Sequence, residues 1–188
     1  MPAQETIRSM LVSGRHRLSV GRAAEVAGLV LKHPKTARQL FECLWDEDPG
    51  VVNRAADALE RLSHHLPTVL VPWKGPLLGL LAEATQNKLR WNLALIVPRL
   101  PLSVSECRRA ASVLQSYLED RSSIVKTLAL QGLADLTCHE PALLPEVLDL
   151  LRTLGRSGTP AESLHYHPFA GSSPQSPPTS ARWPGRCR

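Results

Sequence analysis

Residues 124–136 read IVKTLALQGLADL. From Val125 onward, apolar or small residues recur at offsets 0, 4, 7, 8 and 11, which is the spacing of one face of an α-helix. Two positions in this stripe, Ala129 and Gly132, are small, as they must be where another helix comes close. The stretch therefore predicts an amphipathic α-helix that packs tightly against a neighbouring helix.

The same template occurs twice upstream, and its period is nearly constant. The three copies begin at Val51, Leu89 and Val125, so their starts lie 38 and then 36 residues apart. A weaker copy begins at Val20, 31 residues before Val51. A fixed period of this length is typical of stacked helical repeats. The upstream template positions are Val51, Ala55, Ala58, Leu59 and Leu62; Leu89, Leu93, Ile96, Val97 and Leu100; and, in the weaker copy, Val20, Ala24, Ala27, Gly28 and Leu31.

Helix start and stop signals divide the chain into about four helix pairs and one additional helix. Asp48 can cap a helix that opens with Pro49, and Ser103 or Ser105 can cap the helix that follows them. Because Leu and Ala dominate and aromatic residues are few, we expect an all-α fold. The expected helices span 6–12, 20–32, 35–45, 49–63, 76–84, 88–100, 106–118, 124–136 and 141–154.

Two segments carry a resemblance to a known family. The stretches DEDPGVVNRAADALERL at 46–62 and DRSSIVKTLALQGLADL at 120–136 resemble the HEAT-repeat family, whose turn precedes V-(R/K)-x-x-A-x-x-A-L-x-x-L. The resemblance implies a right-handed α-solenoid of antiparallel helix pairs in a repeat domain that spans 1–155. It also implies that the chain serves as a scaffold or binding surface. Val52 and Gly132 depart from the family's pattern, which has a basic residue and an Ala there.

The composition changes near residue 156. Six of the 16 prolines fall within 160–184, among several serines, and the apolar period disappears. We therefore expect 156–188 to be a disordered tail. A regular array would continue after Leu154 with a trailing helix. A truncated or out-of-frame end is an open alternative to a native tail.

The positive charge lies mainly at the two ends. The chain carries a net +5, but residues 1–35 contribute +4 and residues 156–188 contribute +3. Residues 36–155 hold 12 basic and 14 acidic residues. A repeat body that bound many phosphates would need a basic stripe of its own. The charge distribution therefore disfavours nucleic acid as the partner.

Cysteine use and hydropathy indicate a cytoplasmic protein that does not contact membranes. The four cysteines form no CxxC pair, and Cys43, Cys107 and Cys138 lie in or beside helical patterns, where free cysteines are usually buried. The N-terminus lacks the apolar core of a signal peptide, and no apolar run approaches the ~18–20 residues of a membrane helix.

No motif indicates catalysis, a cofactor or a metal. The histidines and cysteines at 64–65, 138–139 and 165–187 lack the spacing of zinc ligands. The chain has no G-x-S-x-G elbow and no Gly-rich phosphate loop. We therefore expect a non-enzymatic protein without cofactor or metal ion.

The candidate binding residues lie on the trailing helices, which line the inner surface of HEAT-like stacks. A Trp flanked by arginines could anchor a protein or peptide partner, or could stack on a base. The alternative is that the Trp packs against the next repeat while Arg90 and Lys126 form ion pairs between repeats. We expect a protein-interaction module first and a nucleic-acid binder, including a DNA-repair glycosylase, second; a lyase or regulatory subunit is a weaker third. The candidates are Arg54, Arg90, Trp91, Asn92, Arg99 and Lys126.

Overall fold

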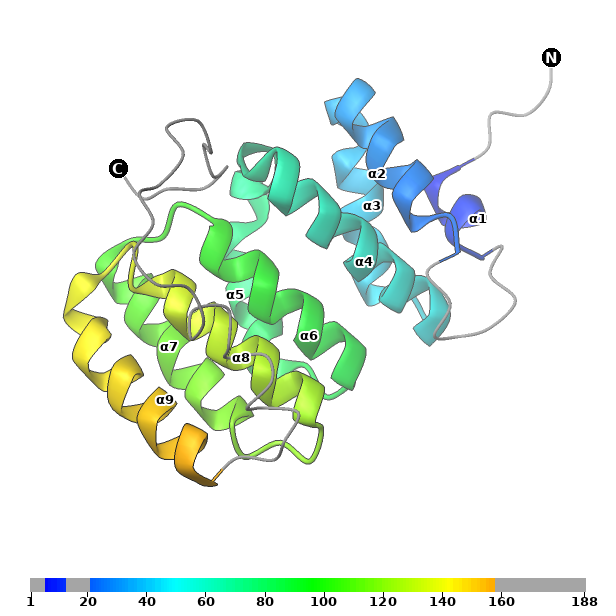
Figure 1. The fold of residues 1–188 in the computed structure, drawn as a ribbon. Coiled ribbons are helices and arrows are strands. Elements are labelled where there is room, and N and C mark those ends of the chain that lie inside the picture. Colours follow the sequence, from blue (N-terminus) through cyan, green and yellow to red (C-terminus); the bar gives the residue numbers. More distant parts are fainter. Residues whose placement is uncertain (1–5, 13–20, 158–188) are drawn as a thin grey trace, which may run out of the picture.

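The computed structural model describes residues 6–12 and 21–157, and in this part of the chain all regular structure is helical (Figure 1). The last helix ends at Ser157, two residues beyond the predicted domain boundary at 155. The predicted tail therefore lies, from residue 158 onward, outside the described residues. None of the described helices is both long enough and apolar enough to cross a bilayer.

The α-helices and short 3-10 helices follow each other with brief connections. Most bounds lie within a few residues of those predicted, but the helices expected over 35–45 and 88–100 change from α to 3-10 geometry after Glu42 and Ile96. The α-helices are α1 (Ile7–Val12), α2 (Ala23–Lys32), α3 (Ala37–Glu42), α4 (Pro49–His65), α5 (Lys74–Glu83), α6 (Asn87–Ile96), α7 (Val104–Tyr117), α8 (Ser123–Leu136) and α9 (Leu144–Ser157). The 3-10 helices are η1 (Pro34–Thr36), η2 (Cys43–Trp45), η3 (Pro67–Trp73), η4 (Val97–Arg99) and η5 (Pro141–Leu143).

The predicted caps begin the helices as expected. Asp48 Oδ1 accepts a hydrogen bond of 2.7 Å from the backbone N–H of Gly50, and Pro49 occupies the first position of α4. At α7, Ser103 and Glu106 form a reciprocal capping box. These side chains satisfy N–H groups that have no partner within the helix, so the local sequence determines where α4 and α7 start.

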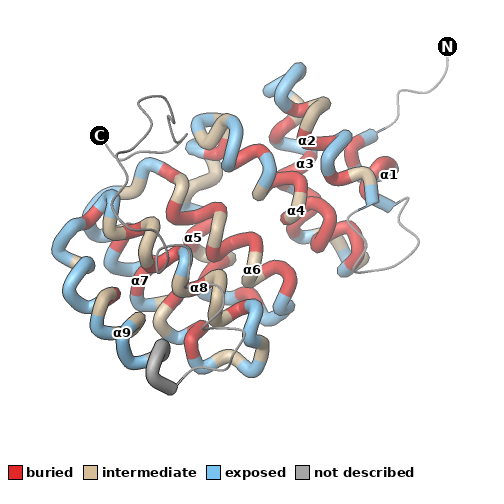
Figure 2. The backbone as a smooth tube through the Cα atoms, viewed as in Figure 1, coloured by how far each residue is buried: buried red, intermediate tan, exposed pale blue. Residues whose placement is uncertain are grey.

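The helices form two layers. Helices α2, α4, α6 and α8 contact each other in succession, and α3, η3, α5 and α7 follow each other on the opposite side (Figure 1). The hydrophobic core lies between the layers. Figure 2 shows α4 and α6 buried along most of their length, whereas α9 is mostly exposed. Within residues 144–153 of α9 only Val147 is buried, and Leu144 is exposed.

All 15 positions of the three strong template copies are buried, which confirms the helical stripes on α4, α6 and α8. Gly132 explains why the third copy contains a glycine. A Cβ atom placed there would clash with the backbone carbonyl oxygen of Ala94 and would lie 3.0 Å from Leu114 Cδ1. Helices α6 and α8 therefore approach so closely that only glycine fits.

The predicted register of the weaker copy on α2 is wrong by one residue. Ala24 and Leu31 are exposed, whereas Ala23, Val26, Ala27 and Val30 are buried. These buried residues fit the same template if it starts one residue earlier, 32 residues before Val51. Because residues 26–31 contain no charged side chain, hydrophobicity alone cannot select the buried face. Packing against α4 selects it.

The cysteine prediction is correct at two positions and wrong at the third. Cys43 and Cys107 are buried free thiols, and burial raises the pKa of the Cys43 thiol to about 11. Cys138 follows the end of α8, is exposed and is not a free thiol. The apolar stripe of α8 ends at Leu136, so nothing in the repeat pattern buries the residue two positions later.

An ion pair joins α5 to α7 and should make stability depend on pH. Lys74 Nζ lies 2.8 Å from Glu106 Oε2, and the backbone N–H of Ser103 donates to the same oxygen. The Lys74 ammonium, followed by the Ser103 N–H, lowers the pKa of Glu106 from 4.5 to about 2. A carboxyl whose pKa is lower in the folded state stabilises the fold above its unfolded pKa, and this contribution is lost as pH falls.

We therefore expect Lys74→Met to raise the pKa of Glu106 toward its ordinary value. The stability difference between wild type and variant should be full above about pH 4.5 and should shrink as pH falls toward 2. An NMR titration of the Glu106 carboxyl carbon, with urea unfolding at several pH values, measures both effects. A wild-type Glu106 that titrates near 4.5 would contradict this prediction.

Candidate functional site

The predicted binding residues lie on successive helices of one layer, but most of them contact neighbouring elements of the chain. Arg54 lies on α4, Asn92 on α6, Arg99 on η4 and Lys126 on α8. Arg90 and Trp91 also lie on α6. The two-layer packing therefore brings them to one side of the core, where the environment of each differs.

Arg54 lies inside the protein. The residue is only 2% exposed, and its Nε–H donates to the backbone carbonyl of Leu11, at the end of α1. The guanidinium also lies against Gly50, where a Cβ atom would come within 2.8 Å of a terminal nitrogen of Arg54. Arg54 therefore holds α1 against α4, and no ligand can reach it without local unfolding.

Arg90 links α6 to the next helix pair. Its Nε–H donates to the carbonyl of Ala84 at 2.7 Å, and its Nη1 pairs with Asp120. The guanidinium also lies 4.8 Å from the centre of the Tyr117 ring. Burial raises the pKa of Tyr117 to about 12, so the ring remains neutral beneath the cation. This arrangement matches the ion pair between repeats that the sequence suggested as the structural alternative.

Asn92 belongs to a buried polar cluster between α4 and α6. Its Nδ2 donates to Asp57 Oδ1 and to the carbonyl of Lys88, both at 3.1 Å. Lys88 Nζ lies 2.7 Å from Asp57 Oδ2. Asp57 and Lys88 are not among the binding residues predicted from the sequence. Their separation of 31 residues is seven less than the 38 between the template copies on α4 and α6, so the repeat period does not indicate the pair.

Arg99 contacts the end of α4. Its Nη1 lies 2.7 Å from Glu60 Oε1 and 2.9 Å from Ser63 Oγ. On the other side, Arg99 lies near Asp135 on α8, whose carboxylate accepts a hydrogen bond from Gln131. Burial raises the pKa of Asp135, and the hydrogen bond from Gln131 and the charge of Arg99 only partly oppose this shift. Arg99 thus links the end of α4 to η4, which continues α6, and places a positive charge near Asp135 on α8.

Trp91 and Lys126 are the candidates whose side chains form no ion pair or hydrogen bond with the described residues. Both are half-buried, and Trp91 packs partly against the core. The indole Nε1 of Trp91 has no hydrogen-bond partner among the described residues. Lys126 lies close enough to Asp120 to help lower the pKa of that carboxyl, which the backbone N–H of Ser122 lowers most. A buried N–H without a partner is costly.

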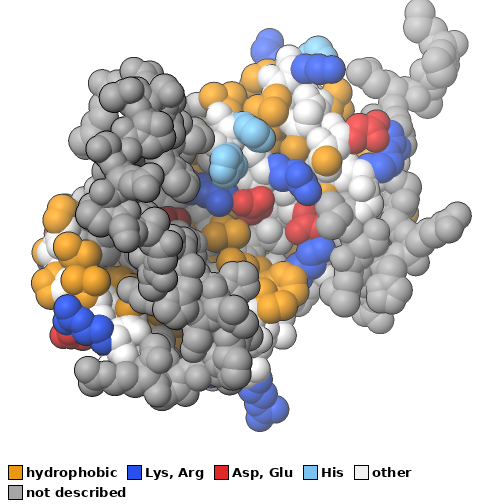
Figure 3. Space-filling view, in the orientation of Figure 1, with side chains coloured by type: hydrophobic (Ala, Val, Ile, Leu, Met, Phe, Trp, Pro, Cys, Tyr) orange, Lys and Arg blue, Asp and Glu red, His pale blue; other side chains and the backbone are white. Residues whose placement is uncertain are grey.

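Trp91 and Lys126 belong to a small accessible surface, which we call the α6–α8 patch. Its other members lie within one or two helical turns of these two residues on α6 and α8, and all five are half-buried or exposed. On the face of α4 seen in Figure 3, Lys and Arg side chains lie next to Asp and Glu side chains. The α6–α8 patch consists of Trp91, Leu95, Lys126, Thr127 and Gln131.

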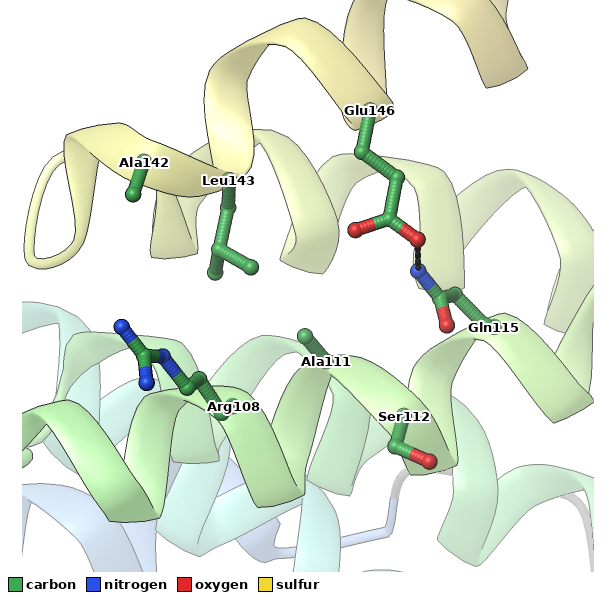
Figure 4. A pocket seen from close by; sticks show the side chains of 7 residues that line it. All are labelled: Arg108, Ala111, Ser112, Gln115, Ala142, Leu143 and Glu146. Atoms are coloured by element: carbon green, nitrogen blue, oxygen red, sulfur yellow. Dashed lines mark hydrogen bonds between the residues drawn. The ribbon is translucent and has the colours of Figure 1, made fainter.

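An open groove of about 340 Å³ lies between α7 and the η5–α9 segment. Gln115 on α7 donates across it to Glu146 on α9 at 2.9 Å, while Arg108 lies at the other end (Figure 4). The floor between them is apolar. The lining includes one hydroxyl, that of Ser112, but no His or Cys, so the groove contains no pair of nucleophile and imidazole base. Sequence analysis did not identify this groove, because its two sides lie about 30 residues apart.

The described residues contain no group of three or more His, Cys, Asp or Glu side chains that could hold a metal ion. The His64 and His65 rings contact each other edge to face, with ring centres 5.4 Å apart. His165, His167 and Cys187, which the sequence analysis also considered, lie outside the described residues.

Comparisons with known proteins add no further guide. No protein-family model, no curated protein and no solved structure matches this chain. A functional assignment therefore depends on the geometry of the chain itself.

Proposed function

We propose that this chain is a non-enzymatic protein-interaction scaffold with HEAT-like architecture, a right-handed α-solenoid of antiparallel helix pairs. The succession of contacts α2 to α4 to α6 to α8, with α3, α5 and α7 in the other layer, supports this architecture. The burial of every position in the three strong template copies supports it as well. We also propose a cytoplasmic location, which the buried free thiols at Cys43 and Cys107 support and the engaged thiol of Cys138 does not.

The observation that carries the proposed function is the state of the cations on the α4–α6–α8 layer. Lys88, Arg90 and Arg99 each pair with a carboxylate on a neighbouring element, at Asp57, Asp120 and Glu60. Phosphate groups would have to displace these carboxylates. The accessible remainder, the α6–α8 patch, combines an aromatic ring, an aliphatic side chain, two uncharged polar side chains and one cation. This mixture suits a protein or peptide better than nucleic acid.

Binding of the proposed protein partner should depend on the α6–α8 patch. We expect Gln131→Arg, which places a bulky charge on an exposed patch residue, to abolish capture of a specific set of proteins by the full-length chain. Trp91→Ala should do the same, but this residue also packs on the core, so Gln131→Arg is the safer variant. Val104→Arg, an equally large change at an exposed position of α7, should leave capture unchanged.

Quantitative mass spectrometry of the captured proteins, with and without nuclease, measures this effect. Loss of the same proteins in both patch variants, with retention in Val104→Arg, supports the proposal. Capture that is insensitive to both patch variants would overturn it. Capture of nuclease-sensitive material, together with oligonucleotide binding that weakens steeply between about 50 and 200 mM salt, would favour the nucleic-acid alternative instead.

A further inference from the structure

Three aromatic side chains form a cluster on the other layer of the protein. The Phe41 ring on α3 lies 5.0 Å from Trp45 on η2, in edge-to-face geometry, and 5.2 Å from Trp73 on η3, in stacked geometry. We call Phe41, Trp45 and Trp73 the aromatic patch. Phe41 is buried beneath the two indoles, so it fixes their positions. The patch therefore consists of two indoles that pack on a buried ring.

Trp45 remains largely exposed although it rests on Phe41. At 55%, it is the most exposed large hydrophobic residue in the described part of the chain. Its indole N–H donates to no group among the described residues. An exposed aromatic ring with an available donor is typical of a surface that binds another chain, because burying the ring would remove much apolar area from water.

The surroundings of the aromatic patch are acidic. Residues 38–48 contain four acidic side chains and one basic side chain, Arg38. Glu42 pairs with Arg38 and Asp46 with Arg8, which leaves the local balance negative. Glu42 lies three residues before Trp45, which places the two side chains on the same face of this helical turn. Glu47 is exposed two residues after Trp45. A ligand for this surface should therefore combine a flat apolar segment with positive charge.

The sequence of residues 172–188, SSPQSPPTSARWPGRCR, has this combination. Pro174 and Pro177 form a P-x-x-P motif, and Pro178 follows directly. The segment also contains three arginines and no acidic residue. Proline restricts the backbone toward the polyproline II helix, so such a segment binds aromatic surfaces at a low cost in conformational entropy.

We propose that the aromatic patch is the docking site for residues 172–188 of this same protein. The prolines pack on Trp45 and Trp73 in polyproline II conformation, and the Trp45 N–H donates to a ligand carbonyl. The arginines face Glu47 and share Glu42 with Arg38. This site lies on the layer opposite the α6–α8 patch, so it is independent of the function proposed above.

Photo-crosslinking in the full-length chain tests the proposal directly. Trp45 is replaced by p-benzoylphenylalanine, a photoreactive aromatic side chain, and the crosslinked peptides are mapped by mass spectrometry. We expect the major crosslink to join position 45 to residues 172–188. A crosslinked monomer indicates docking within one chain and a crosslinked dimer indicates docking between two copies; either supports the assignment of the site.

Matched variants make the test specific. The same probe at Val104, exposed to a similar extent on α7, should give no crosslink to 172–188. The triple substitution Pro174→Ala, Pro177→Ala and Pro178→Ala should reduce the crosslink at least fivefold, and Glu42→Lys with Glu47→Lys should reduce it severalfold at low salt. A probe at Glu47 repeats the measurement with the Trp45 ring intact. Crosslinks that go elsewhere from both probes, or that survive the proline substitutions, would overturn the proposal.

Discussion

Gly132→Ala is expected to lower the free energy of unfolding by about 2–3 kcal/mol, the cost typical of overpacking a closely packed core. The new methyl group would clash with the backbone carbonyl of Ala94, and backbone cannot move aside as a flexible side chain can. Helices α6 and α8 would have to separate, which would loosen the packing around Leu114 and Pro98 as well. Urea unfolding followed by circular dichroism at 222 nm measures the loss.

Gly79→Ala is the matched control for this prediction. Gly79 also lies inside a helix, α5, but a Cβ atom there would meet nothing within 4 Å. Because alanine is the better helix former by about 1 kcal/mol, we expect Gly79→Ala to be neutral or stabilising. Equal effects of the two substitutions would mean that α6 and α8 do not approach as closely as described.

Asp57→Ala is expected to lower the free energy of unfolding by about 3 kcal/mol, the lower end of the range for a broken buried ion pair. The substitution removes the carboxylate 2.7 Å from Lys88 Nζ and the acceptor of the Asn92 amide. Lys88 is only 8% exposed, so water cannot readily replace the lost carboxylate. Chemical unfolding at neutral pH provides the measurement.

Two further variants separate burial from charge. The exposed pair between Arg38 and Glu42 has the same ionic chemistry, with 79% and 60% of the side chains accessible, so Arg38→Ala should cost less than about 0.5 kcal/mol. The double variant Asp57→Leu with Lys88→Met removes both buried charges, and we expect it to recover most of the stability lost in Asp57→Ala. If Asp57→Ala were as mild as Arg38→Ala, the α4–α6 cluster would not contribute to the interface as argued.

The candidate site could be predicted only in part, because the side chains that pair with each other lie far apart in the sequence. The template placed Arg90, Trp91, Asn92 and Arg99 on α6 and η4, on the side that contacts neighbouring helices. It did not show that Asp120, Asp57 and Glu60 engage three of these four side chains. These contacts join residues 30 to 39 positions apart, so they depend on how one repeat stacks on the next. For the same reason, the sequence did not predict the groove between α7 and α9 or the aromatic patch.

The sequence by itself determined the helices, their caps and the buried stripes of α4, α6 and α8. These features follow from interactions within a few residues, namely the 3.6-residue period, the side chains of Asp48 and Ser103, and the positions of proline. Only the tertiary structure decided which face of α2 is buried, why residue 132 is glycine, and which cations are already paired. Each of these depends on the distance between elements distant in sequence, and helix packing sets that distance.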